Sequence, residues 1–280
     1  MNEAKSAVTG TAAKAADRFA IDILGIPSLE LMERASRYVT DHILEHFPDT
    51  DPDRTVRVLV MSSVGNNGVD GVCIARQLLD ERGAFHPVVL LCGFLEKATW
   101  ELLHQLAEYK KRGGEIYFLC PDAPGVPAAV REALSGRMPG GEKASFAGLC
   151  SSADLFSSAD VIVDALFGIG LRRPVEGLYK DLIGAANAAG TSGSCSSEPC
   201  ITARPVKSGM AVRPMKIAVD VPSGINADDG RCMGICFQAD ATLTFGRNKT
   251  GLLTGDGPAA AGEVTVCDIG IPDEAYTVSA

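Results

Sequence analysis

Short runs of apolar residues alternate along this chain with longer segments in which apolar positions recur every three or four residues. The short runs predict buried strands, and the longer segments predict amphipathic helices. Strands that alternate with helices predict an α/β fold of three layers, with a largely parallel central sheet covered on both faces. The predicted strands lie at residues 56–61, 87–92, 115–119, 161–164, 216–221, 239–245 and 263–268. The predicted helices lie at residues 28–47, 69–82, 95–112 and 175–189.

Three stretches depart from this rhythm. Residues 1–16 are rich in alanine and small polar residues and lack the apolar core of a secretory signal, so we expect a disordered tail. Residues 121–150 are rich in Pro, Gly and Ala and predict either a lid or a surface insertion, of which we favour the insertion. Residues 190–213 have low complexity and predict a second, disordered insertion. Residues 17–280 then form a single domain.

Composition narrows the classes of function. The chain has 280 residues, of which 46% are hydrophobic and 22% charged, so it can bury a substantial core. Its net charge of −9 argues against general nucleic-acid binding, although backbone amides and one or two arginines can still hold a nucleotide. No apolar run is long enough to span a membrane. The nine irregularly spaced cysteines indicate reduced thiols, which favours the cytoplasm, with mitochondria as the alternative.

Candidate chemistry gathers where predicted strands end. Residues 65–71, 164–170 and 220–224 each combine glycines with oxygen-bearing side chains directly after a strand. Because the carboxyl ends of parallel strands meet at one edge of a sheet, we expect these loops to share a crevice. The sequence therefore predicts a small-molecule pocket.

The first of these loops, residues 65–71, spaces its glycines as G-x-x-G-x-x-G. That spacing matches neither the dinucleotide fingerprint nor the phosphate loop, and an ordinary tight turn would explain the glycines alone. Asn66, Asn67 and Asp70 lie beside those glycines and favour a binding loop. Residues 168–174 form another glycine-bearing loop, in which Arg172 and Arg173 are either a clamp for a diphosphate or a solvent-exposed basic pair.

Two carboxylates end strongly apolar strands, Asp164 and Asp220. Helix capping or turn formation is the ordinary role of aspartate at such positions. If both face one pocket they repel each other unless a proton or a cation lies between them. Asn67, Asp164 and Ser223 offer only oxygen ligands, which suit an alkali or alkaline-earth ion better than zinc or copper. Lys249 follows a later strand, from which it would reach the same crevice.

Five motifs together resemble one family. In chain order they read IPSLELMERA, GNNGVDG, VDALFGIGLRRPVEG, VDVPSG and ADATLTFGRNKTGLL. They are similar to the motifs of the NAD(P)HX epimerase family, also called the YjeF N-terminal domain, over about residues 17–272. The resemblance implies a Rossmann-like fold, a homodimer, and interconversion of the R and S forms of hydrated NADH or NADPH. A separate dehydratase would then repair both forms.

The resemblance also assigns roles to residues. It implies one potassium ion per subunit, held by Asn67, Asp164 and Ser223. The substrate-binding positions that it implies are Asn66, Asn67, Gly68, Val69, Asp70, Gly168, Ile169, Gly170, Leu171, Arg172, Arg173, Pro174 and Asp220. Inverting the ring carbon that carries the hydroxyl requires proton transfer, and we assign Asp220 as the general acid/base.

The chain departs from the family pattern at two positions in these loops. Val69 and Ile169 stand where relatives usually carry Gly and Thr. Valine disfavours a positive φ, and its side chain would crowd a phosphate if it faced the pocket. The alternative function is a catalytically silent binding module of the RNA-decapping or lipoprotein-binding type. The charged pocket residues favour the enzyme, and a dehydrogenase is disfavoured because its fingerprint is absent.

Overall fold

The protein is described by a computed structural model that places residues 7–48, 55–81, 84–119, 154–190 and 213–277. Seven strands form one sheet in the order β3-β2-β1-β4-β5-β6-β7, and every neighbouring pair is parallel. The strands are β1 (Val56–Ser63), β2 (Phe85–Cys92), β3 (Glu115–Leu119), β4 (Val161–Ala165), β5 (Met215–Val219), β6 (Ala241–Phe245) and β7 (Glu263–Cys267). The predicted three-layer, Rossmann-like fold is confirmed.

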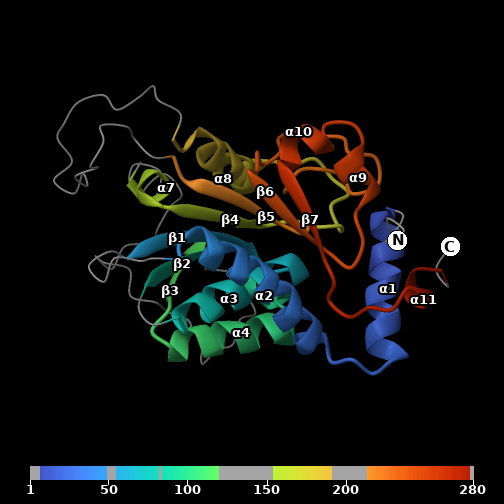
Figure 1. Cartoon of the computed structure of the whole chain (residues 1–280). Coiled ribbons are helices and arrows are strands. Elements are labelled where there is room, and N and C mark those ends of the chain that lie inside the picture. The colour runs from blue at the N-terminus through green and yellow to red at the C-terminus, as the bar shows by residue number, and fades with distance from the viewer. Residues whose placement is uncertain (1–6, 49–54, 82–83, 120–153, 191–212, 278–280) are drawn as a thin grey trace.

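Helices cover both faces of this sheet (Figure 1). The longer helices are α1 (Gly10–Asp22), α2 (Ser28–His46), α3 (Asn66–Leu79), α4 (Trp100–Lys111) and α8 (Gly177–Ala188). The shorter ones are η1 (Leu95–Lys97), α7 (Asp154–Ser158), α9 (Thr250–Leu253), α10 (Gly257–Ala261) and α11 (Glu274–Thr277). No helix in the described ranges has both the length and the apolarity needed to cross a bilayer.

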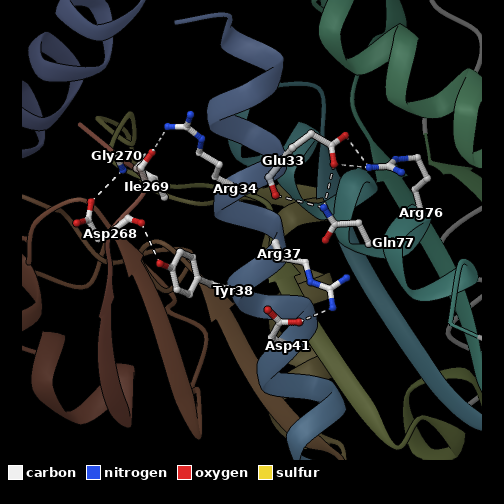
Figure 2. Close-up of a pocket in the computed structure, with 10 residues that line it drawn as sticks. All are labelled: Glu33, Arg34, Arg37, Tyr38, Asp41, Arg76, Gln77, Asp268, Ile269 and Gly270. Atoms are coloured by element: carbon white, nitrogen blue, oxygen red, sulfur yellow. Dashed lines mark hydrogen bonds and ion pairs between the residues drawn. The ribbon is translucent and has the colours of Figure 1, made fainter. Parts of the chain in front are cut away.

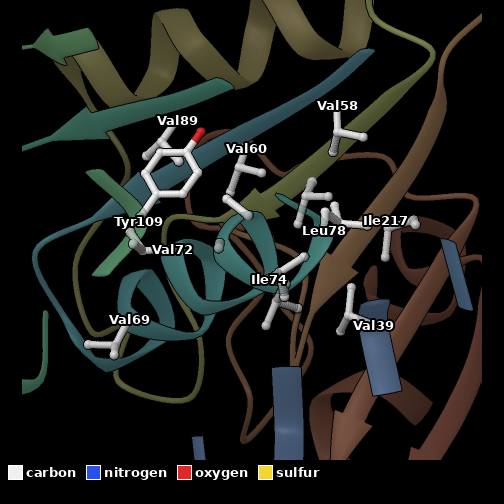
Figure 3. Packing of buried hydrophobic residues seen from close by; sticks show 14 of the residues in the cluster. Val39, Val58, Val60, Val69, Val72, Ile74, Leu78, Val89, Tyr109 and Ile217 are labelled. Atoms are coloured by element: carbon white, nitrogen blue, oxygen red, sulfur yellow. The ribbon is translucent and has the colours of Figure 1, made fainter. Parts of the chain in front are cut away.

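Two apolar clusters hold the layers together. On one face, side chains of α2, α3 and α4 pack on the sheet, among them Val39, Ile74 and Tyr109 (Figure 3). On the other face, residues of α7 and α8 pack on the sheet together with Phe237. Because the inner strands are buried on both faces, they read as continuous apolar runs rather than as alternating patterns. This is why the sequence located them.

The strand order places a switch point between β1 and β4. The chain winds outward from β1 to β3, returns to β4 beside β1, and then winds outward in the other direction. Loops that leave β1 and β4 therefore diverge to opposite faces and open a crevice at the carboxyl edge. The predicted loops at residues 65–71, 164–170 and 220–224 all begin at this edge.

The structure corrects two local expectations. Helix α3 begins at Asn66, so most of the predicted glycine loop is the first turns of that helix. Val69 is consequently helical, and its side chain is fully buried in the apolar core (Figure 3). The expected disordered tail at residues 1–16 is wrong from Gly10 onward, because α1 begins there. The predicted insertions at 121–150 and 190–213 lie outside the described residues, apart from 190 and 213.

Candidate active site

Asp220 follows β5 in a backbone conformation that few residues adopt. Its φ is 67°, and it is the one non-glycine residue with a positive φ among those described. The amide of Asp220 donates to the carbonyl oxygen of Leu243 at 2.8 Å, which ties this turn to β6. Strained positions of this kind persist where the surroundings hold them, and they gather at functional sites.

The two oxygens of the Asp220 carboxylate have different surroundings. Oδ1 accepts from Lys249 Nζ at 2.5 Å, from Thr244 Oγ1 at 3.2 Å and from the Phe245 amide at 3.3 Å. Lys249 is almost fully buried, and its ammonium also donates to Thr244 Oγ1 at 3.0 Å and to the Phe245 carbonyl at 2.7 Å. Within the described residues no donor reaches Oδ2. That oxygen is therefore the one available to a ligand.

Oδ2 faces the start of α3 and the loop after β4. A Cβ atom added to Gly168 would lie 3.5 Å from Asp220 Oδ2 and 3.2 Å from Asn67 Oδ1. The missing side chain at Gly168 thus lets the three predicted loops meet. The structure brings Asn67, Gly168 and Asp220 together, as the strand-end argument predicted.

Asp164 lies beside this group and is fully buried at the end of β4. Its Oδ1 accepts from Ser223 Oγ at 2.6 Å, and its Oδ2 accepts from the Ser223 amide at 2.7 Å. Burial raises the pKa of Asp164 to about 6, although the hydrogen bonds from Ser223 and Leu166 oppose the rise. Ser223 Oγ also accepts from the Phe167 amide at 2.8 Å, which fixes the loop that carries Gly168.

The first turn of α3 presses closely against β1. A Cβ atom at Gly68 would lie 1.8 Å from the carbonyl oxygen of Ser63, so only glycine fits. Ser62 Oγ donates to the Gly68 carbonyl at 2.7 Å and holds the turn in place. Asn66 is exposed, and the side-chain amide nitrogen of Asn67, Nδ2, is buried without a hydrogen-bond partner in the described part of the chain. The unpaired amides of a helix start favour a bound anion nearby.

Two further carboxylates approach Asp220, and only one of them was predicted. Asp70 Oδ1 is buried without a hydrogen bond among the described residues, and burial raises the pKa of Asp70 well above its usual range. The sequence singled out Asp70 but not Asp17 of α1. Burial raises the pKa of Asp17 to about 6, and the charge of Asp220 adds to the rise while Lys249 opposes it. Asp17 thus lies within electrostatic reach of the crevice.

Residues 168–174 follow β4, and Gly168 lies against Asn67 and Asp220. Arg172 pairs with Asp228 at 2.5 Å and also donates to Thr11 Oγ1 at 3.1 Å, so this arginine is held in place. Arg173 is exposed and forms no ion pair with the described part of the chain. Ile169 and Leu171 are partly buried against apolar clusters, whereas Gly170 and Pro174 are exposed. The loop therefore presents one fixed and one free cation.

The oxygen ligands expected for potassium fit such an ion. Ser223 and Asp164 are hydrogen-bonded to each other, and Asn67 lies against Gly168, one residue from Phe167. The buried carboxylate of Asp164 receives only neutral donors, and Asn67 carries a buried, unpartnered amide atom. A cation would balance that charge, and turning the Asn67 amide over would supply an oxygen. No three His, Cys, Asp or Glu side chains gather as a metal site within the described ranges.

A separate hollow of about 900 Å³ lies away from this crevice, between α2, the end of α3 and the segment after β7 (Figure 2). Three arginines line it, and each is already engaged. Arg34 pairs with Glu30, Arg37 pairs with Asp41, and Arg76 pairs with Glu33. Because its positive groups are neutralised within the chain, this hollow offers less to an anionic ligand than the crevice does.

The fold and the crevice define the class of this protein. It is a Rossmann-like α/β protein in which the carboxyl edge of the sheet carries, next to the switch point, a carboxylate paired with a buried lysine and a cluster of oxygen-bearing side chains. A family model for the N-terminus of YjeF-related proteins matches residues 28–251. The chain belongs to this family, as its motifs predicted.

Relatives of known name extend over nearly the whole chain. An NAD(P)H-hydrate epimerase of Limosilactobacillus fermentum is 38% identical over 265 residues, which are 94% of this chain and 97% of that protein. An NAD(P)H-hydrate epimerase of Levilactobacillus brevis is 34% identical, covering 95% and 94%. A bifunctional NAD(P)H-hydrate repair enzyme of Moorella thermoacetica is 33% identical over 92% of this chain but 39% of that protein. The crystal structure of a yeast protein shares the fold, with a TM-score of 0.64, 17% identity, and coverage of 93% and 87%.

Proposed function

We propose that this protein is an NAD(P)H-hydrate epimerase, an isomerase that interconverts the R and S forms of hydrated NADH and NADPH. The observation that carries the proposal is the Asp220 carboxylate, whose Oδ1 is fixed by Lys249 while Oδ2 faces Asn67 and Gly168. The similarity to two epimerases over nearly the full length of each supports the same activity.

The reaction needs a base at a fixed position. The substrate carries a hydroxyl group on the ring carbon beside the nitrogen, and inverting that carbon moves a proton to or from the hydroxyl. Asp220 Oδ2 would exchange this proton, because the other carboxylate oxygen is occupied. Lys249 keeps the carboxylate oriented and neutralises its charge in the ion pair. A positioned acid or base of this kind contributes about 10²–10⁴-fold to the rate.

Other residues of the crevice would bind the diphosphate part of the substrate. The free amides at the start of α3 and the cations of residues 168–174 would bind the diphosphate that joins the two nucleosides. Arg173 is free to do so, and Arg172 is positioned through Asp228. Asn66 and Asp70 belong to the first turns of α3, and Gly170 belongs to the loop of residues 168–174.

Potassium completes the proposed site, with Asn67, Asp164 and Ser223 as the residues that would hold it. When bound, the ion would neutralise the buried Asp164 carboxylate and fix the loops around Asp220. We also propose that the protein is a homodimer in the cytoplasm, with mitochondria as the alternative. Its proposed functional partner is a separate dehydratase; the similarity to the bifunctional NAD(P)H-hydrate repair enzyme of Moorella, which matches this chain over 39% of its own length, supports a link to a second repair activity.

The direct test follows the separated NADPHX epimers by chromatography, with and without the purified protein. The two epimers interconvert spontaneously, so the sample without protein sets the background. The proposal predicts that the protein brings either pure epimer to the equilibrium mixture much faster than buffer does. Equal rates in both samples would reject the enzyme and leave the silent binding module.

A further inference from the structure

Helix α1 presents one stripe of buried alanines, and a single, half-buried carboxyl group lies among them. Ala13, Ala16 and Ala20 are buried, and Asp17 lies among them at the same helical spacing. The alanines let the helix approach its neighbours closely, and the stripe packs beside α11 and the start of α2 (Figure 1). A lone carboxylate on such a face needs a reason, because its burial disfavours the charged form.

Three contacts fix the start of α1 at the rim of the crevice. Val8 pairs with Lys249 in a parallel bridge, donating to the Asn248 carbonyl at 2.8 Å and accepting from the Thr250 amide at 2.9 Å. The Gly10 amide donates to Asp228 Oδ1 at 2.7 Å, on the same aspartate that holds Arg172. The residue that bridges to α1 is thus the lysine that pairs with Asp220. The helix is consequently part of the site.

Charged and titratable groups from four other parts of the chain lie within electrostatic range of Asp17. Asp220 follows β5, Lys249 precedes α9, Asp70 belongs to α3, and Tyr276 belongs to α11. Among the described residues, Lys249 is the cation that lowers the pKa of Asp17, and it is already in an ion pair with Asp220. No hydrogen bond to the Asp17 carboxyl occurs within the described ranges. Burial and the neighbouring Asp220 therefore favour the protonated acid at Asp17, whereas Asp220 is held in an ion pair with Lys249.

We propose that Asp17 is the proton donor of the site and works as a pair with Asp220, the proton acceptor. This inference rests on the proposed epimerase function and adds a second acid/base group to it. Asp70 is a poorer donor because its Oδ1 is enclosed by protein. Pairs of carboxyl groups whose surroundings hold them in different protonation states are the usual arrangement for such chemistry.

Both routes of epimerisation need one donor and one acceptor. In the dehydration route, the Asp17 carboxyl protonates the hydroxyl, the C–O bond breaks with its electron pair leaving on water, and the ring nitrogen supplies electrons to the carbon. Water then adds to the opposite face and gives its proton to Asp220, while the electron pair returns to the ring nitrogen. Asp220 then releases this proton to solvent and Asp17 takes one up, which restores both groups. In the ring-opening route, Asp220 takes the hydroxyl proton as the C=O bond forms and the C–N bond breaks, and Asp17 protonates the nitrogen. The aldehyde then turns over, the nitrogen attacks its other face, Asp17 takes back the nitrogen proton and Asp220 returns its proton to the oxygen. Atoms and charge balance in each route.

The test measures kcat and KM for NADPHX epimerisation from pH 5 to 9 in wild type, Asp17→Asn and Asp17→Glu. Asp22→Asn is the control, since Asp22 is an exposed aspartate on the same helix. Asp17→Asn is expected to lower kcat at least about 100-fold, with little change in KM. Wild-type kcat is expected to fall above about pH 6 as the Asp17 donor loses its proton, and this limb is expected to vanish in Asp17→Asn. Asp17→Glu should recover part of the rate and the limb, and Asp22→Asn should match wild type.

The melting temperature separates catalysis from folding. Asparagine has the same shape and carries no buried charge, so Asp17→Asn should melt no lower than wild type. The role of Asp17 would be overturned if Asp17→Asn kept the wild-type kcat. It would also be overturned if Asp17→Asn and Asp17→Glu both lost activity together with a lower melting temperature. If wild type itself is no faster than buffer, the proposed function fails instead, and the two failures are distinguishable.

Discussion

Replacing Lys249 by methionine removes the ammonium group that neutralises Asp220 and keeps a flexible side chain of similar length. The change deletes three hydrogen bonds of Nζ, to Asp220 Oδ1 at 2.5 Å, Thr244 Oγ1 at 3.0 Å and the Phe245 carbonyl at 2.7 Å. Asp220 keeps only the longer contacts from Thr244 at 3.2 Å and the Phe245 amide at 3.3 Å. The carboxylate stays where it is, because its own backbone is bonded to β6.

The burial of both partners sets the magnitude. The side chains of Lys249 and Asp220 are 2% and 12% exposed, so solvent screens their interaction weakly. Removing one member of a buried ion pair costs about 3–5 kcal/mol, because the other charge is left without a partner. A loss of that size is a large part of the roughly 5–15 kcal/mol that stabilises a typical domain.

Urea unfolding measures this loss. Lys249→Met is expected to lower the free energy of unfolding by about 3–5 kcal/mol. The double variant Lys249→Met/Asp220→Asn is expected to regain at least half of it, since no buried charge then remains unpaired. Lys14→Met is the control, because Lys14 is exposed on α1, and it should change the free energy of unfolding by less than about 0.5 kcal/mol. A loss under about 1 kcal/mol in Lys249→Met, with no recovery in the double variant, would refute a buried and coupled pair.

Three further predictions concern the ion, the packing of α3 and the acid at Asp17. Exchanging potassium for tetramethylammonium at constant ionic strength should lower the melting temperature. With potassium at a hundred times its Kd, the lost stabilisation is about 2.7 kcal/mol. Ser223→Ala should melt at the same temperature in both salts, and identical wild-type melting curves in the two salts would argue against the ion. Gly68→Ala should lower the free energy of unfolding in urea by about 1–3 kcal/mol, because its Cβ would lie 1.8 Å from the Ser63 carbonyl oxygen. Gly170→Ala is the control, because nothing lies within 4 Å of a Cβ added there. Equal stabilities of the two variants would contradict the close approach at Gly68. Folding raises the pKa of Asp17 from 3.8 to about 6, so the wild-type fold becomes less stable as the pH rises from 4 to 6. The asparagine side chain does not ionise, so the melting temperature of Asp17→Asn should exceed that of wild type by an amount that grows over this range. A difference that stays constant would contradict the raised pKa.

Apolar runs and strand-end polar residues carried most of the information in the sequence. Strands buried on both faces read as unbroken apolar segments, and parallel strands bring their carboxyl ends to one edge. Those two facts sufficed to predict that Asn67, Asp164, Asp220 and Ser223 gather at one edge of the sheet. In the structure Ser223 is bonded to Asp164, and Gly168 lies against both Asn67 and Asp220. The position of Lys249 after β6 predicted that it would reach the same crevice, whereas its ion pair with Asp220 was not predicted.

Helix α1 escaped prediction because its buried stripe consists of alanines. Ala13, Ala16 and Ala20 bury little area and hardly raise the local hydrophobicity, so the segment resembled a frayed tail. Their 3-4 spacing, with Asp17 in register, was the one signal that would have found both the helix and its carboxylate. The start of α3 at Asn66 was missed because asparagine and glycine favour turns locally, whereas packing against β1 favours the helix.

The catalytic role of Asp220 is tested most directly by the rate at which Asp220→Asn equilibrates pure R or S NADPHX, measured by chromatography beside wild type, Asp22→Asn and a sample without protein. Asparagine tolerates the positive φ at this position, so the variant is expected to fold. The account predicts a rate at least about 100-fold below wild type, with Asp22→Asn unchanged. An Asp220→Asn variant that equilibrates the epimers as fast as wild type would contradict it.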